Sequence, residues 1–193
     1  MRGLIAAAAL VAALIAAQPA SAGCGGVKDF KPTKRTTKGK PPLAIGDSVM
    51  LLALPYLARA GFEANAHGCR GFPEGLSLLH QRRRHLPKMV VIALGADFNI
   101  TRQEIRRALH NLGPERLLVL VTPIELGGYG GKDAETVRKA GQRYKRHILV
   151  LDWVAYSRGH ASWFQPDGTH LTFKGARQFA KLISTALPHA GGP

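Results

Sequence analysis

The sequence contains no apolar run long enough to span a lipid bilayer comfortably, which takes about 20 residues. Its longest run, residues 4–17, follows the basic Arg2 and precedes the small residues Ala20-Ser21-Ala22. This arrangement is typical of an export signal that is cleaved after Ala22. We therefore expect residues 1–22 to be a signal peptide, no transmembrane span, and a secreted or periplasmic protein. A retained N-terminal anchor is the alternative interpretation.

Acidic residues are scarce: 12 Asp and Glu stand against 27 Lys and Arg, which gives a formal net charge of +15. An exported protein this basic is drawn to anionic surfaces such as cell-wall polymers. Nucleic acid is the competing partner, but the sequence has no zinc-finger spacing, no RNP-like strand and no basic-leucine heptads, so we expect no nucleic acid to bind. Residues 23–42 combine much of the charge with three prolines and predict a basic, flexible arm outside the core.

Cysteine is limited to two residues, Cys24 and Cys69. In an oxidising compartment the two would pair and tie the arm to the domain, whereas two free or separately buried thiols fit the sequence equally well. His80, His85 and His110 lie in predicted helical segments without metal-ligand partners at usable spacing. We therefore expect no metal and no cofactor.

Short apolar segments alternate with helical patterns over the rest of the chain. Strands are predicted at 42–48, 62–66, 89–95, 117–123 and 148–153, and helices at 49–60, 73–85, 101–111, 132–144 and 173–186. Strand and helix alternating five times indicate a parallel sheet covered on both sides. We expect one α/β domain over residues 43–187 and a tail at 188–193. Catalytic residues in such a domain should lie just after the strands.

Candidate catalytic residues occupy these positions. Ser48 stands at the first strand-to-helix turn, where backbone N–H groups and the helix dipole favour a developing negative charge. A serine hydroxyl becomes a good nucleophile only when a base takes its proton. His170, in the loop after the last strand, is such a base, and Asp167 is placed to orient its ring. Taken singly, Asp167 fits a Pro-Asp-Gly turn and Ser48 a helix cap, and His160 is an alternative base.

The motifs Gly46-Asp47-Ser48 and Asp167-Gly168-Thr169-His170 resemble the first and fifth blocks of the SGNH hydrolases, also called GDSL-type esterases and lipases. The likeness covers about residues 43–187. It is strongest to bacterial SGNH domains associated with O-acetyl groups on cell-envelope polysaccharides, through the segments GDSVM, LGAD and WFQPDGTHL. The resemblance implies a flavodoxin-like three-layer α/β/α sandwich with a five-stranded parallel sheet. It also implies that Ser48 is the nucleophile. A G-x-S-x-G elbow is absent, because Met50 occupies the place of its second glycine.

Two positions depart from the family pattern where the oxyanion would bind. The third block normally carries Asn two residues after its Gly, and here that position is Asp97, whose carboxylate would repel an oxyanion. Either Asp97 is protonated, or Asn99 supplies the donor, or the enzyme is slow or inactive. The second block normally offers a glycine N–H, and both Gly68 and Gly71 fit that role as well as they fit a simple loop.

These features predict an exported serine esterase that acts through a Ser-His-Asp triad on an acyl ester, with acetyl preferred, of a cell-envelope carbohydrate. Water as the acceptor would make the protein a hydrolase, and a sugar hydroxyl would make it a transferase. We expect an acylated carbohydrate or another small ester as substrate, an anionic cell-wall polymer as a further partner, and a monomer. The alternative is a catalytically weak or inactive binder of anionic cell-envelope polymer with the same fold.

Overall fold

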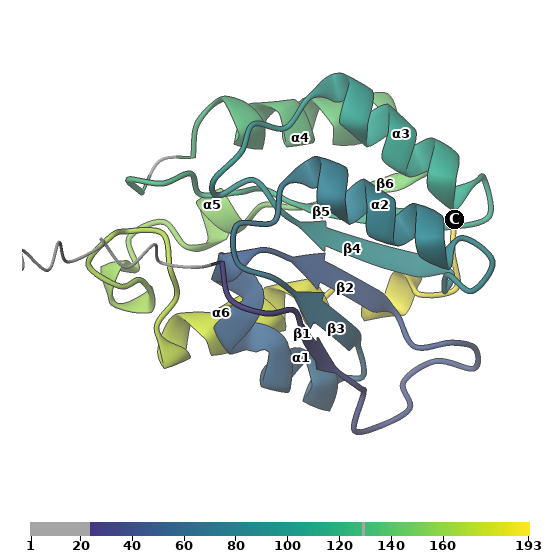
Figure 1. The fold of residues 1–193 in the computed structure, drawn as a ribbon, viewed down its shortest axis with the longest axis horizontal. Coiled ribbons are helices and arrows are strands. Elements are labelled where there is room, and N and C mark those ends of the chain that lie inside the picture. Colours follow the sequence, from purple (N-terminus) through teal and green to yellow (C-terminus); the bar gives the residue numbers. More distant parts are fainter. Residues whose placement is uncertain (1–23, 129) are drawn as a thin grey trace, which may run out of the picture.

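Six strands form the central sheet of the computed structural model, which describes residues 24–128 and 130–193 (Figure 1). In the order in which they lie side by side, the strands are β1 (Lys28–Phe30), β3 (Glu63–Ala66), β2 (Leu43–Gly46), β4 (Met89–Ala93), β5 (Leu117–Val121) and β6 (Ile148–Leu151). β2 to β6 are parallel. When these five strands are numbered from 1 in chain order, starting at β2, their order in the sheet is 2-1-3-4-5, as in flavodoxin. The predicted signal peptide, residues 1–22, lies outside the described residues.

The strand β1 corrects the predicted count of five. Lys28–Phe30 pairs antiparallel with β3 at the edge of the sheet, with Asp29 opposite Asn65. The Asn65 side chain donates a hydrogen bond of 2.5 Å to Asp29, and a disulfide joins Cys24 to Cys69. The arm therefore contributes a short edge strand. All three residues of β1 are exposed, so they show none of the apolar pattern by which a strand is recognised in a sequence.

Helices cover both faces of the sheet, which confirms the predicted three-layer α/β/α sandwich (Figure 1). One face packs against α1 (Leu54–Ala60) and α6 (Phe173–Ser184), and the other against α2 (Phe72–Arg82), α3 (Arg102–Leu112) and α4 (Lys132–Arg143). Alternate strand residues serve the two layers, so Val91 of β4 lies in the first core and Ile92 in the second. None of the described helices is both long and apolar enough to cross a membrane.

The segment predicted as one helix at 49–60 is divided. A 3-10 helix, η1, runs over Ser48–Ala53, and α1 begins at Leu54. Pro55 explains the division, because proline has no N–H to donate and is tolerated only in the first turn of an α-helix. Side-chain caps begin two other helices: Thr101 and Glu104 form a capping box on α3, and the Thr172 hydroxyl accepts the Gly175 N–H at the start of α6.

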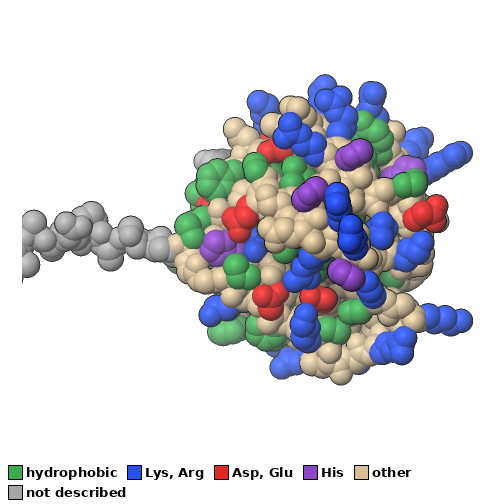
Figure 2. All heavy atoms as spheres, turned by 45° about the vertical axis from the view of Figure 1, so that its right-hand side comes forward, with side chains coloured by type: hydrophobic (Ala, Val, Ile, Leu, Met, Phe, Trp, Pro, Cys, Tyr) green, Lys and Arg blue, Asp and Glu red, His purple; other side chains and the backbone are tan. Residues whose placement is uncertain are grey.

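The surface carries the positive charge that the composition requires. Figure 2 shows that Lys and Arg outnumber Asp and Glu on the face that it presents. Remaining short elements are the helix α5 (Trp153–Tyr156) and the 3-10 helices η2 (Ala161–Trp163) and η3 (Leu187–His189).

Candidate active site

The candidate site lies at the carboxyl edge of the sheet, where β2 and β4 are neighbours. The chain leaves β2 toward β3 on one side and later continues from β4 to β5 on the other, so the strand order reverses between β2 and β4. Parallel sheets open a crevice at such a switch point, and ligands bind there. Ser48, the first residue of η1, follows β2 directly at this position.

Three predicted side chains meet in this crevice. The Ser48 Oγ lies 2.9 Å from His170 Nε2, across 122 positions of sequence. The other ring nitrogen, His170 Nδ1, lies 2.7 Å from Asp167 Oδ2. Burial disfavours ionisation of Asp167, but hydrogen bonds from Thr169 and His170 outweigh it and hold the pKa of this carboxyl below its usual value. An ionised Asp167 favours the ring tautomer in which Nδ1 carries the proton, and that tautomer leaves Nε2 free to accept from Ser48.

The loop that holds Asp167 and His170 is a tight turn. Asp167 Oδ1 accepts the N–H groups of Thr169 and His170, each at 2.9 Å, while Oδ2 faces the imidazole. Gly168 adopts a left-handed φ of +72°, and its Cα packs against Gly128. The buried Thr169 hydroxyl donates to the carbonyl of Glu125 at 3.0 Å. The turn and the imidazole contact are therefore compatible, because they use different oxygens of one carboxylate.

Asp47 joins the turn at Ser48 to the loop that follows β4. Its carboxylate is buried, and Oδ2 accepts the N–H groups of Gly95 at 3.1 Å and Ala96 at 3.2 Å. Oδ1 accepts the Val49 N–H at 3.1 Å. Burial raises the pKa of Asp47 to about 6, although the backbone hydrogen bonds work in the opposite direction. Sequence reasoning missed this role of Asp47, and the only signal for it was the position of the residue directly before Ser48.

The loop at 95–99 carries the predicted third-block residues. Asp97 and Asn99 are both exposed, and in the part of the chain that the structure describes neither side chain makes a hydrogen bond. Charge repulsion from Asp97 adds to the rise in the pKa of Asp47. Neither side chain is therefore held in place by hydrogen bonds as His170 is by its contacts with Ser48 and Asp167.

The loop at 67–71 carries the predicted second-block glycines and is tied to the N-terminal segment. Cys69 forms the disulfide with Cys24 and has a left-handed φ of 56°. Gly68 packs directly on the Cys24 carbonyl, so a side chain at this position would collide with backbone. Gly71 is the N-cap residue of α2 and lies beside the exposed ring of Phe98. The absence of a side chain at Gly68 is therefore a packing requirement.

Polar contacts fix the same loop from both sides. His67 Nδ1 lies 3.0 Å from Glu74, and its Nε2 lies 2.9 Å from the Gly25 carbonyl. The buried Arg70 donates from Nη1 to the carbonyls of Gly46 and Asn65, each at 3.2 Å. Arg70 therefore links the loop to the carboxyl ends of β2 and β3, and His67 links it to α2 and to the N-terminal segment.

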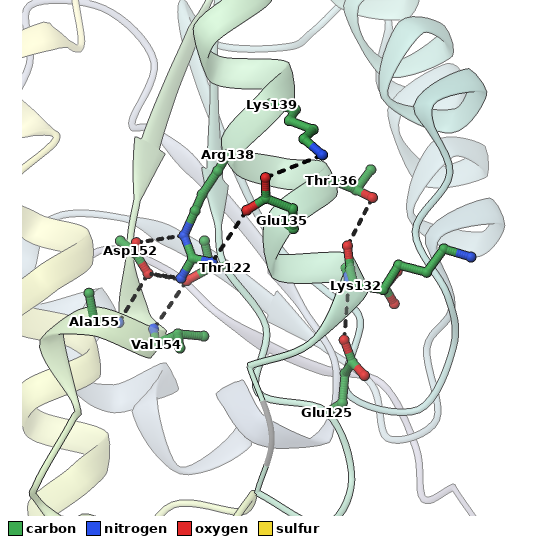
Figure 3. Close-up of polar contacts among 11 residues, drawn as sticks. Thr122, Glu125, Lys132, Glu135, Thr136, Arg138, Lys139, Asp152, Val154 and Ala155 are labelled. Carbon is green, nitrogen blue, oxygen red and sulfur yellow. Dashed lines mark hydrogen bonds and ion pairs between the residues drawn. The ribbon is translucent and has the colours of Figure 1, made fainter.

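Asp152 and His160, two other polar residues near this edge, contact residues outside the Ser48–His170–Asp167 series. Asp152 follows β6 and receives two hydrogen bonds from Arg138, at 2.8 and 3.0 Å, and one from Thr122 at 3.0 Å (Figure 3). The Arg138 contacts outweigh burial and lower the pKa of Asp152. His160, the alternative base, stacks on Trp163 with ring centroids 4.0 Å apart.

Within the described ranges, no group of three or more His, Cys, Asp or Glu residues could hold a metal ion.

No known family profile matches the chain. Its sequence relatives include the peptidoglycan O-acetyltransferase OatA of Listeria monocytogenes, 24% identical over 149 residues that make up 75% of this chain and 24% of that protein. The chain therefore spans about a quarter of the length of the curated relatives it matches.

Two solved structures show the fold relationship. The C-terminal catalytic domain of peptidoglycan O-acetyltransferase A from Streptococcus pneumoniae matches with a TM-score of 0.65 and 27% identity, over 79% of this chain and 94% of that one. A Slackia heliotrinireducens protein described as an SGNH hydrolase matches with a TM-score of 0.58 and 16% identity, over 75% and 96%. The resemblance to SGNH hydrolases is confirmed, and the relatives support the predicted class of ester-acting enzyme.

Proposed function

We propose that this chain, which shares the SGNH hydrolase fold, is a serine esterase or acyltransferase that acts on acetyl esters of a cell-envelope carbohydrate. The contact series from Ser48 Oγ through His170 to Asp167, with steps of 2.9 and 2.7 Å, is the observation on which this proposal rests. Relatives named as peptidoglycan O-acetyltransferases support the acetyl group and the cell-wall polymer. The export signal predicted at residues 1–22 supports a secreted or periplasmic location.

The proposed reaction has two halves. Ser48 Oγ attacks the ester carbonyl carbon while His170 Nε2 takes the hydroxyl proton, and Asp167 stabilises the imidazolium that forms. The carbon–oxygen bond to the sugar then breaks, and the sugar oxygen leaves with the proton from His170. An acyl group remains on Ser48. In the second half His170 takes a proton from water or from another sugar hydroxyl, whose oxygen attacks the acyl carbon. The bond from that carbon to Ser48 Oγ then breaks, and Ser48 Oγ takes the proton back from His170.

Hydrolysis of p-nitrophenyl acetate by the wild-type protein, Ser48→Ala and His170→Ala tests the roles of these residues. We expect the wild type to release p-nitrophenol and both variants to hydrolyse the ester only at the background rate. Equal rates in all three proteins would remove the proposal. Adding a chito-oligosaccharide and separating the products then distinguishes free acetate, the hydrolase product, from an acetylated sugar, the transferase product.

The second candidate function is a catalytically weak or inactive binder of anionic cell-envelope polymer. Asp97 is the observation that favours it, because a carboxylate stands where the resemblance implies an amide donor. Wild-type binding to anionic polymer, without reporter hydrolysis in either the wild type or Asp97→Asn, would support this candidate.

A further inference from the structure

A groove of about 490 Å³ runs between α3 and α4, away from the side chains assigned to catalysis. Its lining includes four cationic residues and the buried side chains that form its floor. The cations are Arg102 and Arg106 of α3 and Lys139 and Arg143 of α4, and the floor is Ile105 and Ala140. The described lining contains no Asp or Glu. The groove is therefore a positively charged channel with an apolar base.

Most of this charge is not neutralised by the protein. Within the described residues Arg102, Arg106 and Arg143 have no carboxylate at ion-pair distance, and only Lys139 has one, Glu135 at 3.3 Å (Figure 3). Glu104, an acid on α3, is occupied by the capping box at the start of that helix. Arg143 also lies over the Tyr144 ring, 5.7 Å from its centroid, which leaves its charge unneutralised. Cations that lack a carboxylate partner in the protein are available to anions from solution.

The cations are arranged in two rows. Arg102 and Arg106 are four residues apart on α3, and Lys139 and Arg143 are four apart on α4, so each pair is separated by a rise of about 6 Å along its helix. One small anion would engage only part of this array, whereas a chain with an anionic group on successive units would engage both rows. Arginine forks suit carboxylate and phosphate groups, which they bind through two parallel hydrogen bonds.

The rest of the lining suits a sugar chain. Thr136, Gln142 and Tyr144 add hydroxyl and amide groups that can hydrogen-bond to sugar hydroxyls. α3 and α4 follow β4 and β5, so both helices begin at the carboxyl edge of the sheet, the edge at which Ser48 lies. A polymer lying in the groove therefore extends toward the edge where the proposed ester chemistry occurs.

We propose that the α3–α4 groove binds an anionic glycan of the cell envelope, so that the polymer extends from the groove toward the sheet edge at which acyl cleavage or transfer is proposed. The choice of a cell-envelope glycan rests on the proposed function. The positive charge of the groove, and the lack of Asp and Glu in its described lining, are observed independently of the proposed function.

Polygalacturonate, a linear glycan with one carboxylate on each sugar, is the probe for this site, and dextran is its uncharged control. The test variant combines Arg106→Glu with Arg143→Glu. The matched control combines Arg107→Glu with Arg177→Glu, which makes the same charge change at exposed arginines outside the groove. We expect the groove variant to bind polygalacturonate at least about tenfold more weakly than the control variant. We expect the wild type and both variants not to bind dextran.

Equal loss of affinity in the groove and control variants would overturn the proposal, because net charge alone would then explain binding. Tighter binding of duplex DNA than of polygalacturonate at equal charge concentration would also overturn it, in favour of a nucleic-acid site. Two measurements distinguish glycan binding in the groove from the proposed esterase function. The groove variant should hydrolyse p-nitrophenyl acetate at the wild-type rate, and Ser48→Ala should bind polygalacturonate with wild-type affinity. Unchanged thermal unfolding shows that the variants are folded.

Discussion

The two sides of Ser48 differ in how fully their polar groups are engaged. On one side His170 contacts both Ser48 and Asp167, and both oxygens of Asp167 accept hydrogen bonds. On the other side Asp97 and Asn99 are exposed, and neither makes a side-chain hydrogen bond within the described residues. The acid and base of the first side come from a single turn of four residues, Asp167 to His170, so their geometry is fixed before substrate arrives. The second depends on loops from separate strands.

Replacing Asp167 by Asn alters the contact between Asp167 and His170 and should have the largest effect on catalysis. An amide can donate to His170 Nδ1 and so favours the wrong ring tautomer, in which Nε2 carries the proton and cannot accept from Ser48. We expect kcat/KM for p-nitrophenyl acetate to fall about 10⁴-fold, the loss typical of this change in Ser-His-Asp enzymes. Glu115→Gln, at an exposed carboxylate, is the matched control. A loss smaller than tenfold would mean that the imidazole is not oriented by Asp167.

Removing the disulfide tests how the loop at 67–71 is held. Cys24 and Cys69 are separated by 45 positions, and opening a ring of this size should lower the free energy of unfolding by about 4 kcal/mol. Urea unfolding of the wild type and of Cys24→Ser combined with Cys69→Ser measures the difference. Reducing the wild type should reproduce it, and reducing the double variant should change nothing. Equal stability of all samples would show that the β1 pairing alone holds the segment.

Replacing Asp97 by Asn should strengthen the less engaged side. An amide donates where a carboxylate repels, and one donor to an oxyanion is worth about 10²–10³ in rate, so we expect p-nitrophenyl acetate hydrolysis to rise by up to about 10²-fold. The steady-state rate at pH 8 is the measurement. Asn99→Ala is the companion variant, and a loss of activity there would identify Asn99 as the donor instead. A fall in the rate of Asp97→Asn would mean that the carboxylate itself takes part.

The same contrast explains which features the sequence could predict. Asp167 and His170 stand three positions apart, so one short motif contains both of them, and continuous apolar runs such as β4 and β5 identify buried strands. The strand β1 could not be found in this way, because three exposed residues acquire their pairing from β3, more than 30 positions later. The role of Asp47 was equally hidden, since its partners Gly95 and Ala96 are brought to it only by the packing of β4 beside β2.

Asp47 connects the two sides of Ser48, and its titration gives the smallest predicted effect. Burial raises the pKa of this carboxyl from 3.8 to about 6, so the folded state holds the proton more tightly than the unfolded state does. The resulting stabilisation is complete below about pH 4 and is lost as the pH rises through 6. We therefore expect the stability of the wild type relative to Asp47→Asn, measured by urea unfolding, to fall by about 2–3 kcal/mol between pH 4 and pH 8. Because repulsion from Asp97 contributes to the raised pKa of Asp47, Asp97→Asn should move this transition to lower pH. A stability difference that stays constant over the whole range would mean that Asp47 keeps one protonation state, and that the loops on the two sides of Ser48 are joined by a link that pH does not alter.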